Sequence, residues 1–90
     1  MEEILGKAEE LETNYDWVKV ATLYKQALGA VGKTDFLMKG EIHERIGYSF
    51  FRAAFQAETQ EEFSMRMQLA VEAYERAAEL LKRVERAERS

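Results

Sequence analysis

The sequence predicts an all-α protein of four antiparallel helices, arranged as two helix-turn-helix hairpins of which the second is longer. Three observations support this prediction. The 90 residues contain no proline, apolar residues recur at steps of three and four, and glycines and capping residues separate the periodic runs. We expect one domain, with the first hairpin over residues 1–34 and the second over residues 35–88. We also consider that the chain is the first piece of a longer repeat protein.

The first predicted helix covers residues 2–12. Ile4, Ala8 and Leu11 fall on one of its faces, and acidic residues occupy the other. An isolated helix of fewer than about 12–15 residues is marginal in water, so we expect this helix to fray.

The second predicted helix begins after Thr13 or Asn14, either of which can cap its free amides, while Asp16 suits the positive end of its dipole. Its apolar positions are Trp17, Val20, Tyr24, Ala27, Leu28 and Val31. Gly29 and Gly32 mark the expected end of this helix, and Gly32 is the better candidate for the left-handed residue that closes a helix.

The third predicted helix, capped by Thr34 or Asp35, includes the stretch 41–57 and has apolar residues on two faces. One stripe contains Ile42, Ile46, Phe50, Ala53 and Ala57, and the other contains Tyr48, Phe51 and Phe55. Such a helix needs neighbours on both sides, so we expect it to form the middle layer. Because an interior glycine costs about 1 kcal/mol relative to alanine, we attribute Gly47 to the close approach of a neighbouring helix.

The fourth predicted helix starts near Gln60, because Thr59 and Glu62 have the spacing of a capping box. Its apolar seam contains Phe63, Met67, Ala70, Tyr74, Ala77, Leu81 and Val84, widened by Leu69, Ala73 and Leu80. This seam is broader than a two-stranded coiled coil needs, so packing inside a globule is favoured over self-association. From Arg83 onward the sequence is highly charged, and we expect that end to be solvated.

The composition argues against several classes of function. Acidic residues outnumber basic ones by 17 to 13 and the formal charge is −4, so we expect no nucleic-acid partner. Without cysteine, the chain has no disulfide and no thiolate nucleophile. The sequence lacks a signal-peptide pattern and any apolar run of membrane-spanning length, so we expect no membrane insertion and a cytoplasmic location.

We expect no catalytic residue, metal or cofactor. The acids next to the single histidine, His43, do not share its helix face, so we interpret His43 as a partly buried structural residue. The run 29–34 ends in Gly-Lys-Thr, but its first glycine is too close to that end, and a helix precedes it where a nucleotide-binding loop needs a strand. The chain is therefore not expected to be an enzyme.

The second helix of each hairpin has a small–aromatic–small pattern. The two sets are Val20, Tyr24 and Ala27, which follow Asp16-Trp17, and Ala70, Tyr74 and Ala77, which follow Ile46-Gly47 and Phe50 in the preceding helix. In these positions the chain resembles the tetratricopeptide repeat family, with two degenerate repeats. The resemblance implies stacked hairpins, a non-catalytic scaffold role and a fully buried Tyr74. Lys7-Ala8 and the extended second hairpin depart from the family pattern, and a three-helix microtubule-interacting-and-trafficking type of module is the related alternative.

The resemblance also implies a groove lined by the first helix of each hairpin. The predicted partner-binding residues are Glu9, Glu12, Glu41, Glu44, Tyr48, Phe51 and Phe55. An acidic groove with an aromatic end suits a protein or peptide partner with basic residues and an apolar anchor. Aromatic residues at helical spacing are more often core than binding site, so we weigh core as the first interpretation of the last three. The alternative function is structural, a homodimer formed through an uncovered apolar face.

Overall fold

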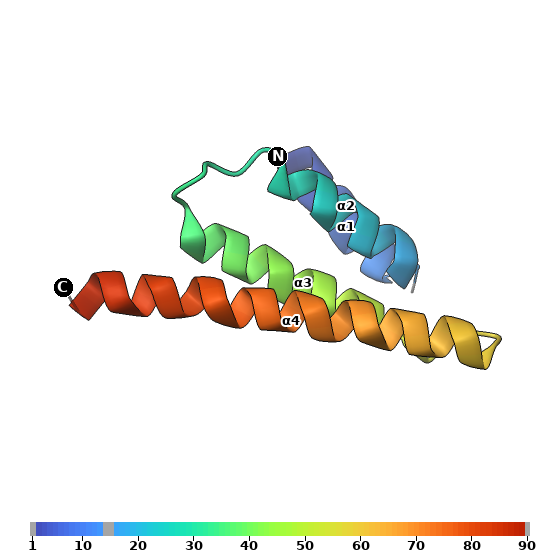
Figure 1. Cartoon of the computed structure of the whole chain (residues 1–90). Helices are drawn as coiled ribbons and strands as arrows, with labels where there is room; N and C mark the ends of the chain where they lie inside the picture. Colours follow the sequence, from blue (N-terminus) through green and yellow to red (C-terminus); the bar gives the residue numbers. More distant parts are fainter. Residues whose placement is uncertain (1, 14–15, 90) are drawn as a thin grey trace.

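The computed structural model describes residues 2–13 and 16–89 of the chain. Within these ranges it has no strand and consists of α1 (Glu2–Thr13), α2 (Trp17–Leu28), α3 (Phe36–Ala54) and α4 (Gln60–Arg89). α1 packs on α2, α2 on α3 and α3 on α4, so two helical hairpins are joined through α2 and α3 (Figure 1). The predicted all-α fold, with a longer second hairpin and the third helix as the middle layer, is confirmed.

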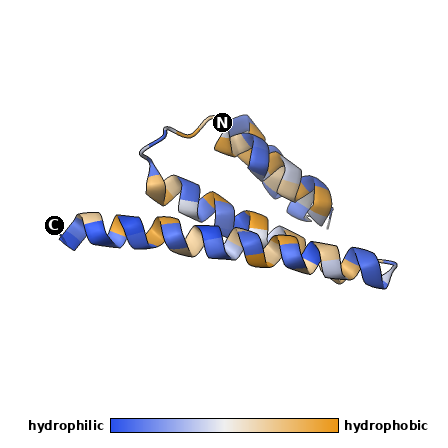
Figure 2. Cartoon of the chain, viewed as in Figure 1, coloured by the Kyte–Doolittle hydropathy of each residue, from blue (hydrophilic) through white to orange (hydrophobic). Residues whose placement is uncertain are grey.

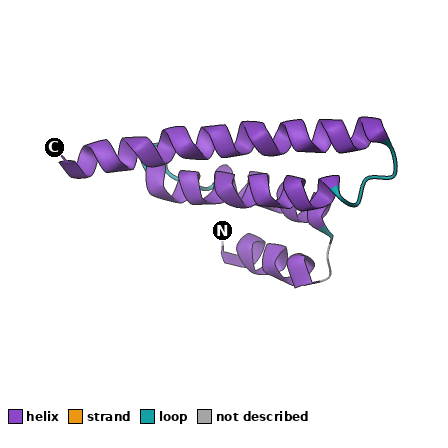
Figure 3. Cartoon of the chain, turned by 90° about the horizontal axis from the view of Figure 1, so that it is seen from below, coloured by secondary structure: helices purple, strands orange, loops and turns teal. Residues whose placement is uncertain are grey.

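The second hairpin determines the length of the molecule, which extends over 47 × 27 × 18 Å. α4 has 30 residues, and its C-terminal end projects beyond the start of α3 in both ribbon views (Figures 1 and 3). Each helix has both apolar and polar residues along its length (Figure 2). Amphipathic helices need this mixture, because each buries one side against its neighbour and exposes the other.

Small residues close the first hairpin. Ala8 of α1 and Val20, Ala21 and Ala27 of α2 are completely buried. Small side chains let the two helix backbones approach closely, and the buried ring of Tyr24 fills the remaining space. The apolar position predicted at Leu11 lies outside the described side chains, as does the cap predicted at Asn14.

The predicted start of α2 needs correction, and so does the residue preferred for closing its end. Thr13 is the last residue of α1, so it cannot cap α2; Asp16 holds the cap position, without a side-chain hydrogen bond to the helix. At the other end α2 stops at Leu28 with Gly29 in the cap position, so the end predicted at Gly29 is confirmed and the preference for Gly32 is wrong. The amides of residues 29–31 bond to carbonyls three residues earlier, which tightens the last turn and ends the helix. No left-handed backbone occurs at Gly32.

The start of α3 is capped as predicted, because Oδ1 of Asp35 accepts a hydrogen bond from the Met38 amide at 3.1 Å. The predicted first stripe is buried at Ile42, Ile46, Phe50 and Ala53, whereas Ala57 lies beyond the end of the helix. This stripe faces the core, and its burial explains why α3 is the middle layer.

The interpretation of the second α3 stripe as core is wrong. Tyr48, Phe51 and Phe55 are 43%, 37% and 67% exposed. The reason lies in the helix order: α2 and α4 occupy the other sides of α3, and α1 packs on α2 with no close backbone approach to α3. Among the described helices, none therefore covers the outer side of this aromatic stripe.

The two glycines inside α3 permit the close approach of α4. A Cβ atom on Gly47 would lie 3.0 Å from Cγ and Cδ2 of Tyr74, and one on Gly40 would lie 2.8 Å from Cδ2 of Leu81. The predicted reason for Gly47 is confirmed. Tyr74, however, is 41% exposed, so its predicted full burial is wrong. One face of its ring covers Gly47, and none of the described helices covers the remainder.

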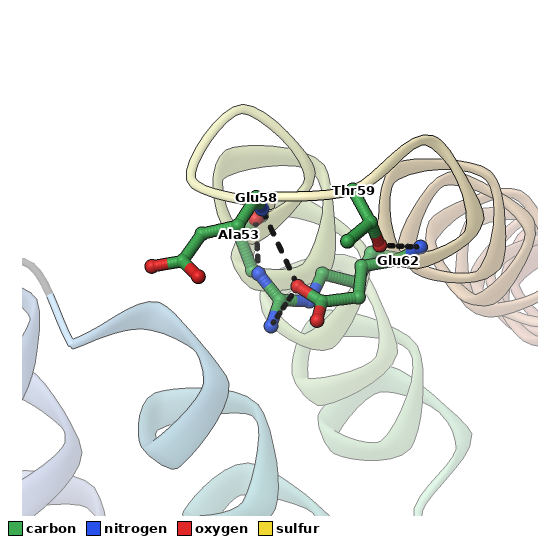
Figure 4. A network of polar contacts seen from close by, with 5 residues as sticks. Ala53, Glu58, Thr59 and Glu62 are labelled. Atoms are coloured by element: carbon green, nitrogen blue, oxygen red, sulfur yellow. Dashed lines mark hydrogen bonds and ion pairs between the residues drawn. The ribbon is translucent and has the colours of Figure 1, made fainter.

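The capping box at the start of α4 is confirmed in part (Figure 4). The Glu62 amide donates to Thr59 Oγ1 at 3.1 Å, but the Glu62 carboxylate accepts from the amide of Glu58 rather than from that of Thr59. Arg66 donates to the carbonyl of Ala53 at 2.8 Å and pairs with Glu62 at 3.6 Å. These contacts fasten the beginning of α4 to the end of α3.

Candidate interaction surface

A groove lies between the first helices of the two hairpins. Glu9 and Leu5 of α1 form one wall, and Glu41 and Arg45 of α3 form the other, around a hollow of about 180 Å³. Ile42 and Met38 complete its apolar floor. Two of the predicted carboxylates, which are 32 positions apart in the sequence, therefore line the same groove.

A second hollow continues this groove toward the middle of α3. It is lined by Glu12 of α1, by Glu44, Arg45 and Tyr48 of α3, and by Tyr74 of α4. Arg45 belongs to both hollows, so they form one surface that has α3 as its floor and α1 and α4 at its sides. Burial and the nearby carboxylate of Glu44 raise the pKa of Tyr74, which remains a neutral hydroxyl group at physiological pH.

A buried tyrosine positions the charges at the centre of this surface. The Tyr24 hydroxyl donates to Glu12 Oε1 at 3.1 Å and accepts from Arg45 Nη1 at 3.0 Å. Burial raises the pKa of Tyr24, and the hydrogen bond that Arg45 donates to the Tyr24 hydroxyl raises the pKa of Arg45. The hydroxyl therefore stays protonated and the guanidinium stays charged, and together they hold α1 and α3 in a fixed relation.

Sequence reasoning missed Arg45. Arg45 is four residues after Glu41 and three before Tyr48. This spacing places all three residues on one side of the helix and is the sequence signal from which Arg45 could have been included in the predicted site. The positive charge of Arg45 balances the negative charge of one of the four predicted carboxylates, and the Glu12 carboxylate already accepts a hydrogen bond from Tyr24. The groove thus remains acidic at Glu41 and Glu44.

Aromatic side chains extend the surface to the end of α3. Tyr48 packs edge-on against Trp17 with ring centroids 5.4 Å apart, and Phe55 packs edge-on against both Phe51 at 5.1 Å and Phe63 at 6.0 Å. The row is therefore held by mutual contacts while its outer faces stay exposed. Phe63 of α4 is a further member that the predicted site did not include.

Arg52 places a positive charge at the aromatic end of the surface. Its guanidinium lies 5.5 Å from the ring centre of Trp17 and 6.0 Å from that of Tyr48, an arrangement in which the ring faces attract the cation. We define the acidic–aromatic surface as the predicted Glu9, Glu12, Glu41, Glu44, Tyr48, Phe51 and Phe55 together with Arg45, Arg52, Phe63 and Tyr74. Its acidic half lies over the start of α3, and its aromatic half lies over the end.

His43 lies on another side of α3 and is partly buried, as predicted. Burial, followed by the charges of Arg76 and Lys39, lowers its pKa, so the ring is neutral at physiological pH. Among the residues that the structure describes, no three His, Asp or Glu side chains are grouped closely enough to hold a metal ion. None of the helices within residues 2–13 and 16–89 combines the length and apolarity needed to cross a membrane.

Comparisons of the chain with models of known protein families, with curated proteins and with solved structures gave no match.

Proposed function

We propose that the chain is a non-catalytic interaction module whose acidic–aromatic surface binds a basic and apolar segment of a partner protein. The observation that supports this proposal is the gathering of carboxylates from α1 and α3 beside an exposed aromatic row. Exposed aromatic rings are the side chains that most often supply binding energy at protein interfaces, and carboxylates select Lys and Arg.

The layout of the surface indicates how the partner's residues are spaced. Glu41 and Tyr48 are seven positions apart, as are Glu44 and Phe51, which is about 10.5 Å along a helix. A helical partner that lies along α3 therefore places its basic residues about two turns from its apolar anchors. A segment that alternates basic and apolar residues at every position does not match this layout.

The burial of the first hairpin supports the proposed relation to tetratricopeptide repeats, because Val20, Tyr24 and Ala27 are all fully buried. In the second hairpin Ala70 and Ala77 are buried but Tyr74 is not, so that repeat is the more divergent one. Residues 2–13 and 16–89 form four helices, and we therefore do not propose a three-helix module of the microtubule-interacting-and-trafficking type.

Fluorescence anisotropy with labelled helical peptides tests the proposal. The binding peptide has two lysines about two helical turns before a Leu-Phe anchor; one control peptide has its residues scrambled, and the other has glutamate in place of lysine. We expect saturable binding of the first peptide alone, weakened by salt because the contacts include exposed charges. Equal binding of all three peptides would refute the charge selection.

Two double variants locate the binding site. E41Q/E44Q removes two exposed charges and should weaken binding about 3–10-fold, whereas F51A/F55A removes anchor contacts and should weaken it about tenfold or more. The matched control E10Q/E75Q changes two exposed carboxylates that do not belong to the acidic–aromatic surface. Unchanged affinity in both test variants would place the site elsewhere.

A second candidate function is self-assembly through the same aromatic row, which exposes Tyr48, Phe51 and Phe55 without a covering helix. Light scattering over a dilution series separates the two functions. A mass of 10.5 kDa at all concentrations supports the partner-binding role. A stable mass of twice that value, lost in F51A/F55A, supports a homodimer.

A further inference from the structure

A separate hollow lies on the side of α3 that faces away from the acidic–aromatic surface. α2 and α4 both pack on α3, yet their described backbones make no close approach to each other. The space between them, about 340 Å³, is floored by Ile46, Phe50, Leu69 and Ala73. Its size is at the lower end of the range for small-molecule sites, and its floor is apolar.

The rim of this hollow is more basic than the rest of this acidic protein. Lys25 from α2 and Arg76 from α4 stand on opposite walls, with His43 from α3 between the two helices and Glu72 as the one carboxylate of the lining. The cation on Lys25 lies 5.0 Å from the ring centre of Phe50. It is thereby held at the edge of the apolar floor instead of extending into solvent.

The remaining rim groups have hydrogen-bonding capacity left for a ligand. Arg76 Nη1 pairs with Glu79 at 3.0 Å, and a guanidinium group has five N–H donors in all. The carboxylate of Glu72 accepts from the Gln68 amide group at 3.4 Å. The neutral ring of His43 offers one donor and one acceptor without adding charge.

We propose that the hollow between α2 and α4 binds a small amphipathic anion, an aliphatic body ending in one carboxylate. The aliphatic body covers the floor formed by Phe50 and Leu69, and the carboxylate lies between Lys25 and Arg76. Charge selects the ligand class: the lining has two cations, Lys25 and Arg76, against one carboxylate, Glu72, so a carboxylate is favoured over an ammonium group of the same chain length.

Proton NMR with decanoate tests this proposal, and the single histidine of the chain makes the His43 ring signals identifiable without further assignment. We expect decanoate to shift these signals saturably. Decyltrimethylammonium, which has the same alkyl length and the opposite charge, should not shift them. Binding of the labelled basic peptide is measured on the same samples, so failure of this site and failure of the acidic–aromatic surface remain distinguishable.

Variants connect the signal to the rim. K25Q/R76Q removes both cations and should weaken decanoate binding at least tenfold, the equivalent of about 1.4 kcal/mol. The matched control K19Q/K82Q removes two exposed lysines that do not line the hollow and should leave the affinity unchanged. Circular dichroism verifies that both variants are folded. The proposal is overturned if decanoate does not shift the His43 signals, if the cationic probe shifts them equally, or if K25Q/R76Q binds as the parent chain does.

Discussion

Replacing Gly47 by alanine tests the packing of α4 on α3. In an open helix this change stabilises by about 1 kcal/mol, because alanine has the higher helix propensity. Here the added Cβ would lie 3.0 Å from Cγ and Cδ2 of Tyr74, and overpacking of this kind costs about 1–3 kcal/mol. We therefore expect G47A to destabilise the protein by about 1 kcal/mol, measured by urea unfolding followed by circular dichroism.

The same substitution should change sign once the ring is removed. In a Y74A background the Cβ of G47A meets no ring, so the variant should gain up to about 1 kcal/mol relative to Y74A alone. G6A is the matched control, because Gly6 is also inside a helix but has no heavy atom within 4 Å of its added Cβ. If G47A stabilises the parent chain as much as G6A does, the ring of Tyr74 does not pack on Gly47 and the reasoning is refuted.

Three further changes test separate contacts by urea unfolding. T59A removes the acceptor for the Glu62 amide and should cost about 1 kcal/mol, whereas no loss would show that α4 starts elsewhere. Tyr24→Phe deletes the hydroxyl that joins Glu12 to Arg45 and should cost about 1–3 kcal/mol, because both partners lose a hydrogen bond. Because burial lowers the pKa of His43 below 6.5, the unfolded chain binds its proton more readily, and stability is lost as the pH falls below about 6.5. The H43Q variant should lose less stability between pH 7 and pH 5.5, and an identical loss in both proteins would contradict this assignment.

The helices and much of the core follow from local signals. Periodicity at three and four residues identified the buried positions of α3 from Ile42 to Ala53, and capping chemistry identified Asp35 and Thr59. These signals depend on contacts within a few residues of each other, which a sequence displays directly. The approach at Gly47 was predictable for the same reason, since an unexplained glycine inside a helix requires a neighbour.

The exposure of the aromatic residues could not be predicted in the same way. A stripe such as Tyr48, Phe51 and Phe55 shows the same spacing whether a helix covers it or not. Its exposure depends on α1 packing against α2 rather than α3. That arrangement is set by tertiary contacts, which the spacing of residues within one helix does not reveal. The roles of Arg45 and Tyr24 also depend on tertiary contacts, because their hydrogen bond joins residues 21 positions apart. The burial of Tyr74 was predicted wrongly because the family pattern assumes a covering element that α4 lacks here.

The most direct test of the proposed interaction role is a map of backbone amide chemical shifts during titration with the basic and apolar peptide. We expect the largest changes along the exposed side of α3, at Glu41, Glu44 and Phe51, and at Glu9 of α1, with little change around the hollow between α2 and α4. Shifts confined to that hollow, or no saturable shifts at all, would contradict the proposal that the acidic–aromatic surface binds a partner.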